Sequence, residues 1–437
     1  MAGCLRIRPM SIISPDYAVF TPAINSMYVD AIASTLPNDR QLPDGLTLDD
    51  FAFWLKSSNL WHHEHFLHSI GQYKVGKQFN NAVTQRGRTD GVLIGDSGGY
   101  QIGKGKLEGL DGLVAGMSGN DACAAWRSAY DARKWIVTWL ETYTNYAMTL
   151  DMPLWATGSL GKSSPFHKCT DKQLTDMTVE NLQFIDSHRQ GRTKWLNVIQ
   201  GLDAAGMIKW WKAVKWFDCA GYACTSVIGK KLGLRAVLEP LLTMRDDDAF
   251  RKGRDWIHFL GISTAPWAVM YTAIQQAIRA EINPNLRISY DSASPIRLAS
   301  VNEQYNTSPA FGLDENGWGI GKVQTPQSKK LVGSQEPVPF NSPLGDRLTL
   351  GDLNFREGNK FTRRQFDTLS LVYLINHNIW VYLTAFQTAN DLAFAGNRSQ
   401  IPPKYKACIE VIEETFKVDD WQGLLSKEQV LLDSFTG

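Results

Sequence analysis

Short apolar segments alternate with longer amphipathic segments along most of this chain. The amphipathic segments suit helices, which we expect over residues 121–141, 171–187, 204–216 and 265–280. Parallel strands must be joined by crossovers of a dozen or more residues, so the alternation predicts a (β/α)8 TIM barrel with its active site at the strand ends. The expected strands cover residues 17–20, 91–94, 146–150, 195–199, 221–224, 256–260 and 287–290.

The pattern changes in the last third of the chain. Between about residues 303 and 352, Gly, Pro, Ser, Asn and Gln dominate with little periodicity, which predicts a loop-rich insertion. Helices are expected to follow over residues 366–394, 405–416 and 427–435. We therefore predict three consecutive parts, which are a catalytic barrel core over 1–302, the insertion over 303–352, and C-terminal helices packed on the barrel over 353–437.

Composition narrows the classes of partner. The 437 residues carry a formal net charge of only +1, which argues against non-specific coating of nucleic acid and requires any basic face to be local. The most apolar stretch, residues 369–386, is interrupted by Asn376, His377 and Asn378, so we expect no membrane partner. The N-terminus lacks the basic-then-apolar order of a signal peptide, and a cytoplasmic location is expected.

Two aspartates stand out because each lies at the end of an expected strand. Asp96 is followed by Ser97 and two glycines, which allow the backbone to turn sharply beside a ligand. Such a turn can equally be a capped loop without a chemical role. Asp291 follows the expected strand over 287–290, far from Asp96 in the sequence. A barrel would bring the two carboxylates to the same rim.

These motifs resemble those of the tRNA-guanine transglycosylase superfamily, in the same order and at similar spacing, across roughly residues 19–394. Segment 95–101 resembles the family's aspartate-serine-glycine-glycine-aromatic-glutamine motif, and segment 290–297 resembles its nucleophile segment with the trailing proline and arginine. Other segments that resemble family motifs are Leu150-Asp151, Ile199-Gln200-Gly201, Gly221-Tyr222-Ala223, His258-Phe259-Leu260-Gly261-Ile262 and His377-Asn378-Ile379.

The resemblance implies an enzyme that exchanges a guanine in nucleic acid for another base with retained configuration, which requires two displacements. Asp291 would attack C1′ and hold the nucleotide covalently, while Asp96 would act as general acid and base with a pKa nearer neutrality than that of a free aspartate. Asp151 would accept hydrogen bonds from guanine N1 and the 2-amino group. The other implied base contacts are Gln200 at the carbonyl or N7 edge, Tyr100 and Leu260 on the two faces, and Gly201, Ser226, Val227 and Gly261 around the slot.

Departures from the family narrow this interpretation. The family's zinc site uses a Cys-x-Cys-x-x-Cys segment and the histidine that His377 resembles, but residues 333–354 contain no cysteine. We therefore expect no metal and no cofactor, and a packed or hydrogen-bonded His377. The segment from His62 to His68 could hold a metal, because residues 65 and 68 lie one helical turn apart, although a surface or phosphate-contacting role is the more common one.

The missing zinc motif and the Tyr-Asp-Ser-Ala-Ser-Pro segment favour the bacterial and phage branch, which modifies DNA with 7-deazaguanines. Thr225 and Ser226 stand where the family has paired glycines, which favours a compact base such as 7-cyano-7-deazaguanine (preQ0). The alternatives are a divergent tRNA-guanine transglycosylase and a non-catalytic nucleic-acid-binding barrel, with a homodimer possible in each case. The residues expected to contact the nucleic acid are Arg88, Arg297, Lys329 and Lys330.

Overall fold

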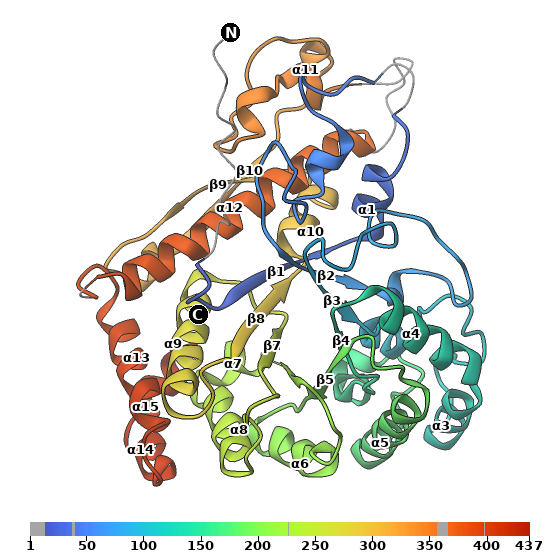
Figure 1. Ribbon diagram of the computed structural model, residues 1–437, viewed down its shortest axis with the longest axis vertical. Coiled ribbons are helices and arrows are strands. Elements are labelled where there is room, and N and C mark those ends of the chain that lie inside the picture. Colours follow the sequence, from blue (N-terminus) through green and yellow to red (C-terminus); the bar gives the residue numbers. More distant parts are fainter. Residues whose placement is uncertain (1–13, 37–39, 226, 356–365, 397) are drawn as a thin grey trace. The chain divides into compact units, whose positions relative to one another are not determined.

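Eight parallel strands form a closed barrel in the computed structural model, which describes residues 14–36, 40–225, 227–355, 366–396 and 398–437. The strands follow one another around the barrel in chain order, with helices between them (Figure 1). This confirms the predicted (β/α)8 barrel. The strands are β1 (Val19–Ile24), β2 (His65–Ser69), β3 (Val92–Asp96), β4 (Tyr146–Met148), β5 (Lys194–Ile199), β6 (Gly221–Thr225), β7 (Trp256–Leu260) and β8 (Arg287–Ser292).

The helices that connect the strands from β3 onward agree with the expected positions, with two differences. The expected helix over 121–141 is two helices, because the backbone leaves the helical region at Ala129 (φ −76°, ψ 50°), and α2, α7 and α8 were not expected. These helices are α2 (Gly99–Gly103), α3 (Gly119–Ser128), α4 (Tyr130–Tyr143), α5 (Asp171–His188), α6 (Ala204–Val214), α7 (Val227–Leu232), α8 (Arg235–Asp246) and α9 (Ala265–Glu281).

Strand β2 was not expected, and it corrects the interpretation of the histidine cluster. All five of its residues are buried, so it lacks the alternation that marks a half-exposed strand. Side chains three residues apart in a strand point to opposite faces, so His65 and His68 do not share the helical face that a metal site would need. In the described part of the chain, no group of three or more His, Cys, Asp or Glu side chains could hold a metal ion.

The chain divides into two compact units, each built from distant parts of the sequence. The first combines residues 1–66, 79–92 and 293–402, and the second combines 67–78, 93–292 and 403–437. Neither unit coincides with the three consecutive parts expected from the sequence.

In the first unit, the long helix α12 (Thr368–Phe394) packs against α1 (Ser26–Ile32) and α10 (Ser294–Ser300). Alone among the described helices, α12 is long and apolar enough to cross a membrane, but 89% of its most apolar window is buried inside the protein, as in a core helix. The region expected to be loop-rich contains a two-stranded antiparallel sheet of β9 (Gln304–Ala310) and β10 (Gly319–Gln324), followed by the short helix α11 (Leu350–Leu353). The residues of β10 are mostly exposed, so no apolar alternation marked it.

In the second unit, the C-terminal helices α13 (Pro403–Thr415), α14 (Trp421–Lys427) and α15 (Gln429–Ser434) pack beside α8 and α9 (Figure 1). Arg245 of α8 donates hydrogen bonds to the carbonyl groups of Thr415, Phe416 and Val418 at the end of α13 and just beyond it. Arg235, also on α8, forms an ion pair with Asp433 at 2.8 Å. The C-terminal helices therefore pack against α8, which precedes β7, and α9, which follows it.

Candidate active site

The first expected carboxylate, Asp96, is the last residue of β3. Its Oδ1 accepts a hydrogen bond from the backbone N–H of Gly98 at 3.1 Å. Gly98 has a φ of +85°, and a Cβ there would lie 2.7 Å from the Cα of Gly71, so only glycine fits this turn. Burial raises the pKa of Asp96, and the charge of Asp291 adds to the rise, while hydrogen bonds from Ser69 and Gly98 oppose it.

The second expected carboxylate, Asp291, lies near the end of β8 in a different environment. Its Oδ1 accepts from the backbone N–H of Gly261 at 3.0 Å and lies 3.3 Å from Nε2 of His258. Both contacts end on the same oxygen, and among the described residues no hydrogen bond reaches Oδ2. Asp291 is therefore held at one oxygen and keeps the other available to a reacting atom.

His258 is a residue of the site to which the sequence assigned no role, although its motif was noted. It is fully buried on β7, where the parallel register places it opposite Ser289 of β8. Nδ1 of His258 lies 2.7 Å from Oγ of Ser289, which also accepts from Nε1 of Trp256 at 2.8 Å. Serine, histidine and aspartate in hydrogen-bonded order resemble a serine hydrolase, but Ser289 is fully buried and cannot reach a substrate. Of Ser289, His258 and Asp291, Asp291 is therefore the residue that can react with a substrate.

The third carboxylate of the site, Asp151, follows β4 and is held by Gln200. The Gln200 side-chain amide donates to Oδ2 of Asp151 at 2.8 Å and to the carbonyl of Met152 at 2.9 Å, and its oxygen accepts from the N–H of Leu154 at 2.9 Å. Both amide hydrogens are thus used by the protein, so in this structure Gln200 orients the Asp151 loop instead of presenting a free amide to a base. Burial, together with the charge of Asp96, raises the pKa of Asp151 to about 7.

The other expected base contacts differ in their surroundings. Tyr100, at the start of α2, is 61% exposed, and its ring lies 5.6 Å from that of Trp155. Leu260 at the end of β7 is half-buried. Gly201 has a packing reason to be glycine, because a Cβ there would lie 2.3 Å from the backbone N of Met207. Ser226 lies outside the described residues, and of Val227 only its position at the start of α7 is described.

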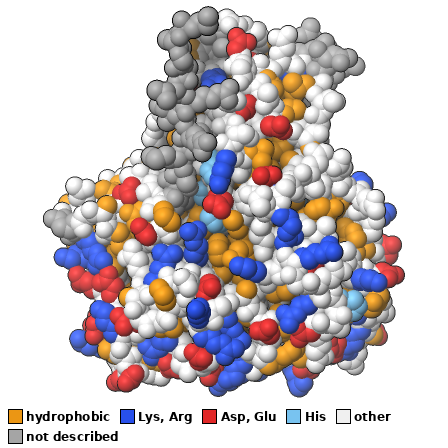
Figure 2. Space-filling model, viewed as in Figure 1, with side chains coloured by type: hydrophobic (Ala, Val, Ile, Leu, Met, Phe, Trp, Pro, Cys, Tyr) orange, Lys and Arg blue, Asp and Glu red, His pale blue; other side chains and the backbone are white. Residues whose placement is uncertain are grey.

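The expected nucleic-acid contacts Arg88, Arg297, Lys329 and Lys330 are all exposed and all belong to the first unit, whereas the three carboxylates belong to the second. Basic and acidic side chains are interspersed over the face in view in Figure 2, which agrees with a net charge of only +1. Binding of a nucleic acid would therefore depend on local groups of Lys and Arg side chains.

His377, which resembles the family's zinc-binding histidine, has protein partners at both ring nitrogens. Nε2 lies 2.8 Å from the carbonyl oxygen of Asn306, so this nitrogen carries the proton and donates it. Nδ1 lies 3.0 Å from the hydroxyl of Ser342, which can donate to it. This neutral ring is the hydrogen-bonded histidine that the sequence predicted.

We expect the stability of the protein to depend on pH through His377. Burial lowers its pKa to about 4 from 6.5, so as the pH falls from 6.5 to 4 the unfolded chain binds a proton that the folded protein does not. At pH 5 this difference destabilises the fold by about 2 kcal/mol relative to neutral pH. His377→Gln keeps an N–H donor but does not titrate, and subtracting its unfolding free energy from that of the wild type at each pH isolates the contribution. A difference independent of pH would contradict the assignment.

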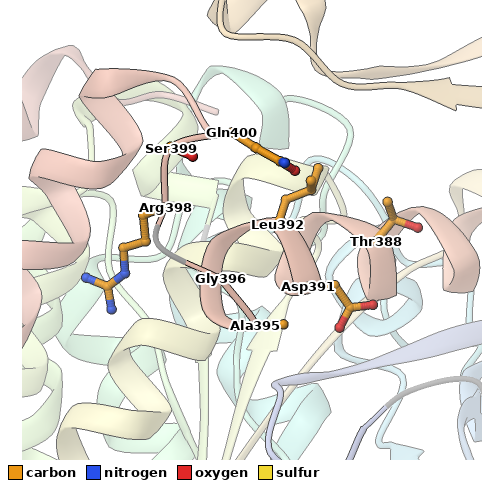
Figure 3. A pocket seen from close by; sticks show the side chains of 8 residues that line it. All are labelled: Thr388, Asp391, Leu392, Ala395, Gly396, Arg398, Ser399 and Gln400. Atoms are coloured by element: carbon orange, nitrogen blue, oxygen red, sulfur yellow. The ribbon is translucent and has the colours of Figure 1, made fainter.

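A separate hollow of about 340 Å³ lies at the C-terminal end of α12 (Figure 3). Thr388, Asp391 and Leu392 reach it from the helix, and the Arg398 side chain points away from them. Asp391 already accepts hydrogen bonds from Tyr17 at 2.9 Å and Gln387 at 2.8 Å. None of the expected site residues lines this hollow, so it is separate from the chemistry of the three carboxylates.

Comparison of the chain with known proteins adds no family assignment. No protein-family model matches it, and no curated protein matches it significantly in sequence.

Proposed function

We propose that this protein is a base-exchange glycosyltransferase that replaces a guanine in DNA by a 7-deazaguanine such as 7-cyano-7-deazaguanine, acting in the cytoplasm. The observation that carries the proposal is the contrast between two carboxylates of one barrel. Burial raises the pKa of Asp96, whereas Asp291 accepts a backbone N–H and lies within hydrogen-bonding distance of an imidazole nitrogen. A carboxyl group whose burial favours the protonated form suits the acid role, and a carboxylate held at one oxygen by two hydrogen-bonding partners suits the nucleophile role.

The reaction follows from these roles. Oδ2 of Asp291 forms a bond to C1′ of the target nucleotide as the bond from C1′ to N9 of guanine breaks, and the electron pair leaves with the base. Protonated Asp96 supplies the proton that neutralises the departing guanine. The incoming base then gives its N9 proton to Asp96 and attacks C1′, which returns the electron pair to Asp291. Configuration at C1′ is retained because it is inverted twice.

Asp151 supports the choice of a guanine-like base. A carboxylate accepts hydrogen bonds without donating any, which matches the N1–H and 2-amino donors on one edge of guanine and of 7-deazaguanines. The two donors of Gln200 fix the Asp151 segment, so the carboxylate is positioned before the base arrives. Tyr100, with 61% of its surface exposed, offers a ring on which a base can stack.

We expect base binding to strengthen as the pH rises through 7, because only the ionised form of Asp151 accepts both donors. With the pKa at about 7, the ionised fraction increases about tenfold between pH 6 and pH 8, and the Kd for guanine should fall by a similar factor. Asp151→Asn should bind weakly and without this pH dependence. Calorimetric titration with guanine from pH 6 to 8 measures both, and an unchanged pH dependence in the variant would assign the titration to another group.

The choice of DNA rests on the resemblance to the DNA-modifying branch, which the missing zinc motif favours. His377 supports this choice, because protein groups lie at both of its ring nitrogens, where the related histidine would bind zinc. The test is incubation of the protein with labelled guanine or 7-cyano-7-deazaguanine and either duplex DNA or tRNA at matched salt. Label in DNA supports the proposal. Label in tRNA alone overturns the choice of polymer but keeps the reaction, and label in neither polymer favours a non-catalytic barrel.

Polymer binding should depend on the exposed pair Lys329 and Lys330. Reversing both charges to Glu should weaken binding across DNA sequences and lower the slope of log affinity against log salt by about two, because each lysine accounts for about one phosphate contact. Lys427→Glu, at a side chain 77% exposed in the second unit, is the matched control and should leave the slope unchanged. Equal slopes in all three proteins, measured by fluorescence anisotropy, would remove these lysines from the interface.

A further inference from the structure

A chain of buried polar side chains runs along the barrel strands and ends on Asp291. Trp256 Nε1 lies 2.8 Å from Ser289 Oγ, Ser289 Oγ lies 2.7 Å from His258 Nδ1, and His258 Nε2 lies 3.3 Å from Oδ1 of Asp291. Ser289 and His258 are fully buried and Trp256 nearly so, whereas Asp291 is the member closest to solvent. Buried polar groups in such a sequence are strongly coupled, because each one limits the proton positions of the next.

Two of the partners limit the directions of the hydrogen bonds in the chain. An indole nitrogen can only donate, so Ser289 Oγ accepts from Trp256, and an ionised carboxylate can only accept, so Nε2 of His258 donates to Asp291. The serine hydroxyl keeps its own proton, which it can donate to Nδ1 of His258. A neutral imidazole with Nδ1 accepting carries its proton on Nε2, which faces the Asp291 carboxylate. The order of donors therefore ends with an N–H aimed at Asp291.

We propose that Trp256, Ser289 and His258 are positioning residues that hold Asp291 as an ionised, correctly oriented nucleophile. This inference rests on the proposed base exchange. The N–H of His258 and the N–H of Gly261 both engage Oδ1, which leaves Oδ2 to form the bond to C1′. When the ester forms, Oδ1 becomes its carbonyl oxygen and keeps the same two donors.

The charged groups around Asp291 explain why such a chain is needed. His258 faces it from β7, and Asp96 on β3 interacts with it electrostatically, which contributes to the raised pKa of Asp96. Asp151 in turn interacts electrostatically with Asp96. Two carboxyl groups that repel each other share one proton unless donors stabilise one of the charges. The donors on Oδ1 stabilise a negative charge on Asp291, and burial favours the protonated form of Asp96.

The first test concerns the proton itself and needs no activity. In protein labelled with ¹⁵N-histidine, NMR should find the His258 ring in the Nε2–H form at neutral pH. His258→Gln identifies the resonance by removing it. Ser289→Ala removes the donor to Nδ1, and the ring should then populate both neutral forms, whereas Ser289→Thr should preserve the Nε2–H form. A wild-type ring protonated at Nδ1 would overturn the proposal.

The second test concerns the nucleophile, with duplex DNA and labelled guanine as probes. Ser289→Ala should slow exchange about ten- to a hundredfold in kcat with little change in the KM for guanine, because Asp291 loses a well-oriented donor. Ser289→Thr and His258→Gln retain the donors and should retain most of the wild-type kcat, while His258→Leu should not.

These outcomes separate the inference from the proposed function. If the wild type exchanges guanine but Ser289→Ala keeps the wild-type kcat, the positioning role is wrong and the transglycosylase proposal stands. If the wild type exchanges nothing, the proposed function fails. Circular dichroism on each variant separates loss of fold from loss of positioning, and the Ser289→Thr and Ser289→Ala pair differs only by the hydroxyl group and one methyl.

Discussion

Replacing Asp291 by Asn should lower base exchange by at least about a thousandfold and abolish the covalent protein–nucleic acid adduct, because an amide cannot attack C1′ as a carboxylate does. The asparagine side chain still fits the position, and its oxygen can accept from the N–H of Gly261 as Oδ1 of Asp291 does. The loss should therefore appear in kcat with the fold unchanged. Single-turnover mixing of protein with labelled nucleic acid, followed by denaturing electrophoresis, measures the adduct directly.

The matched control is Asp176→Asn on the exposed face of α5, where the carboxylate forms only a surface ion pair with Lys172. This variant should exchange bases and form the adduct as the wild type does. A denaturant-stable adduct in Asp291→Asn would move the nucleophile to another side chain, and Asp96 and Asp151 would be the next carboxylates to test. An equal loss in both variants would indicate a general effect of surface or fold.

The barrel could be predicted from the sequence because most of its strands are short apolar segments that end in polar residues. The segments before Asp96 and Asp291 have this form, and both strands end close to where the pattern placed them. Strand β2 was not predicted from the sequence, because all of its residues are buried and two of them are histidines, which suggested a metal site instead of a strand. The pairing of β9 with β10 was not predicted either, because an exposed strand such as β10 needs no apolar alternation.

The site was predictable as a set of strand ends but not as a network. Asp96, Asp151 and Asp291 could be selected because each follows an apolar segment. The role of His258 depends on the register of β7 against β8, which places it opposite Ser289, and no spacing within one strand encodes that register. Gln200 is a similar case, since its three hydrogen bonds to the Asp151 segment depend on how two loops meet. The pattern along the chain identifies the residues, and the tertiary structure determines their partners.

The two principal carboxyl groups each have two hydrogen-bonding partners, and these differ in kind: Asp96 meets Ser69 and the N–H of Gly98, and Asp291 meets His258 and the N–H of Gly261. Asp96 is held mainly in a buried setting that disfavours its charge, and the nearby charge of Asp291 adds to this. Asp291 has a backbone N–H at 3.0 Å and a ring nitrogen at 3.3 Å on one oxygen, both of which stabilise a negative charge. The raised pKa favours the protonated form of Asp96, which is the form required at the moment guanine leaves.

Asp96→Asn should consequently lower exchange by about a hundred- to ten-thousandfold while leaving guanine binding nearly unchanged, because it removes proton transfer and keeps the shape of the site. The rate profile should also lose its basic limb in the variant, because that limb reports the loss of the Asp96 proton. Residual exchange is measured against pH by incorporation of labelled guanine, and guanine binding is measured by calorimetry.

Wild-type turnover in Asp96→Asn would transfer the acid–base role to Asp151, whose pKa of about 7 makes it the alternative proton carrier.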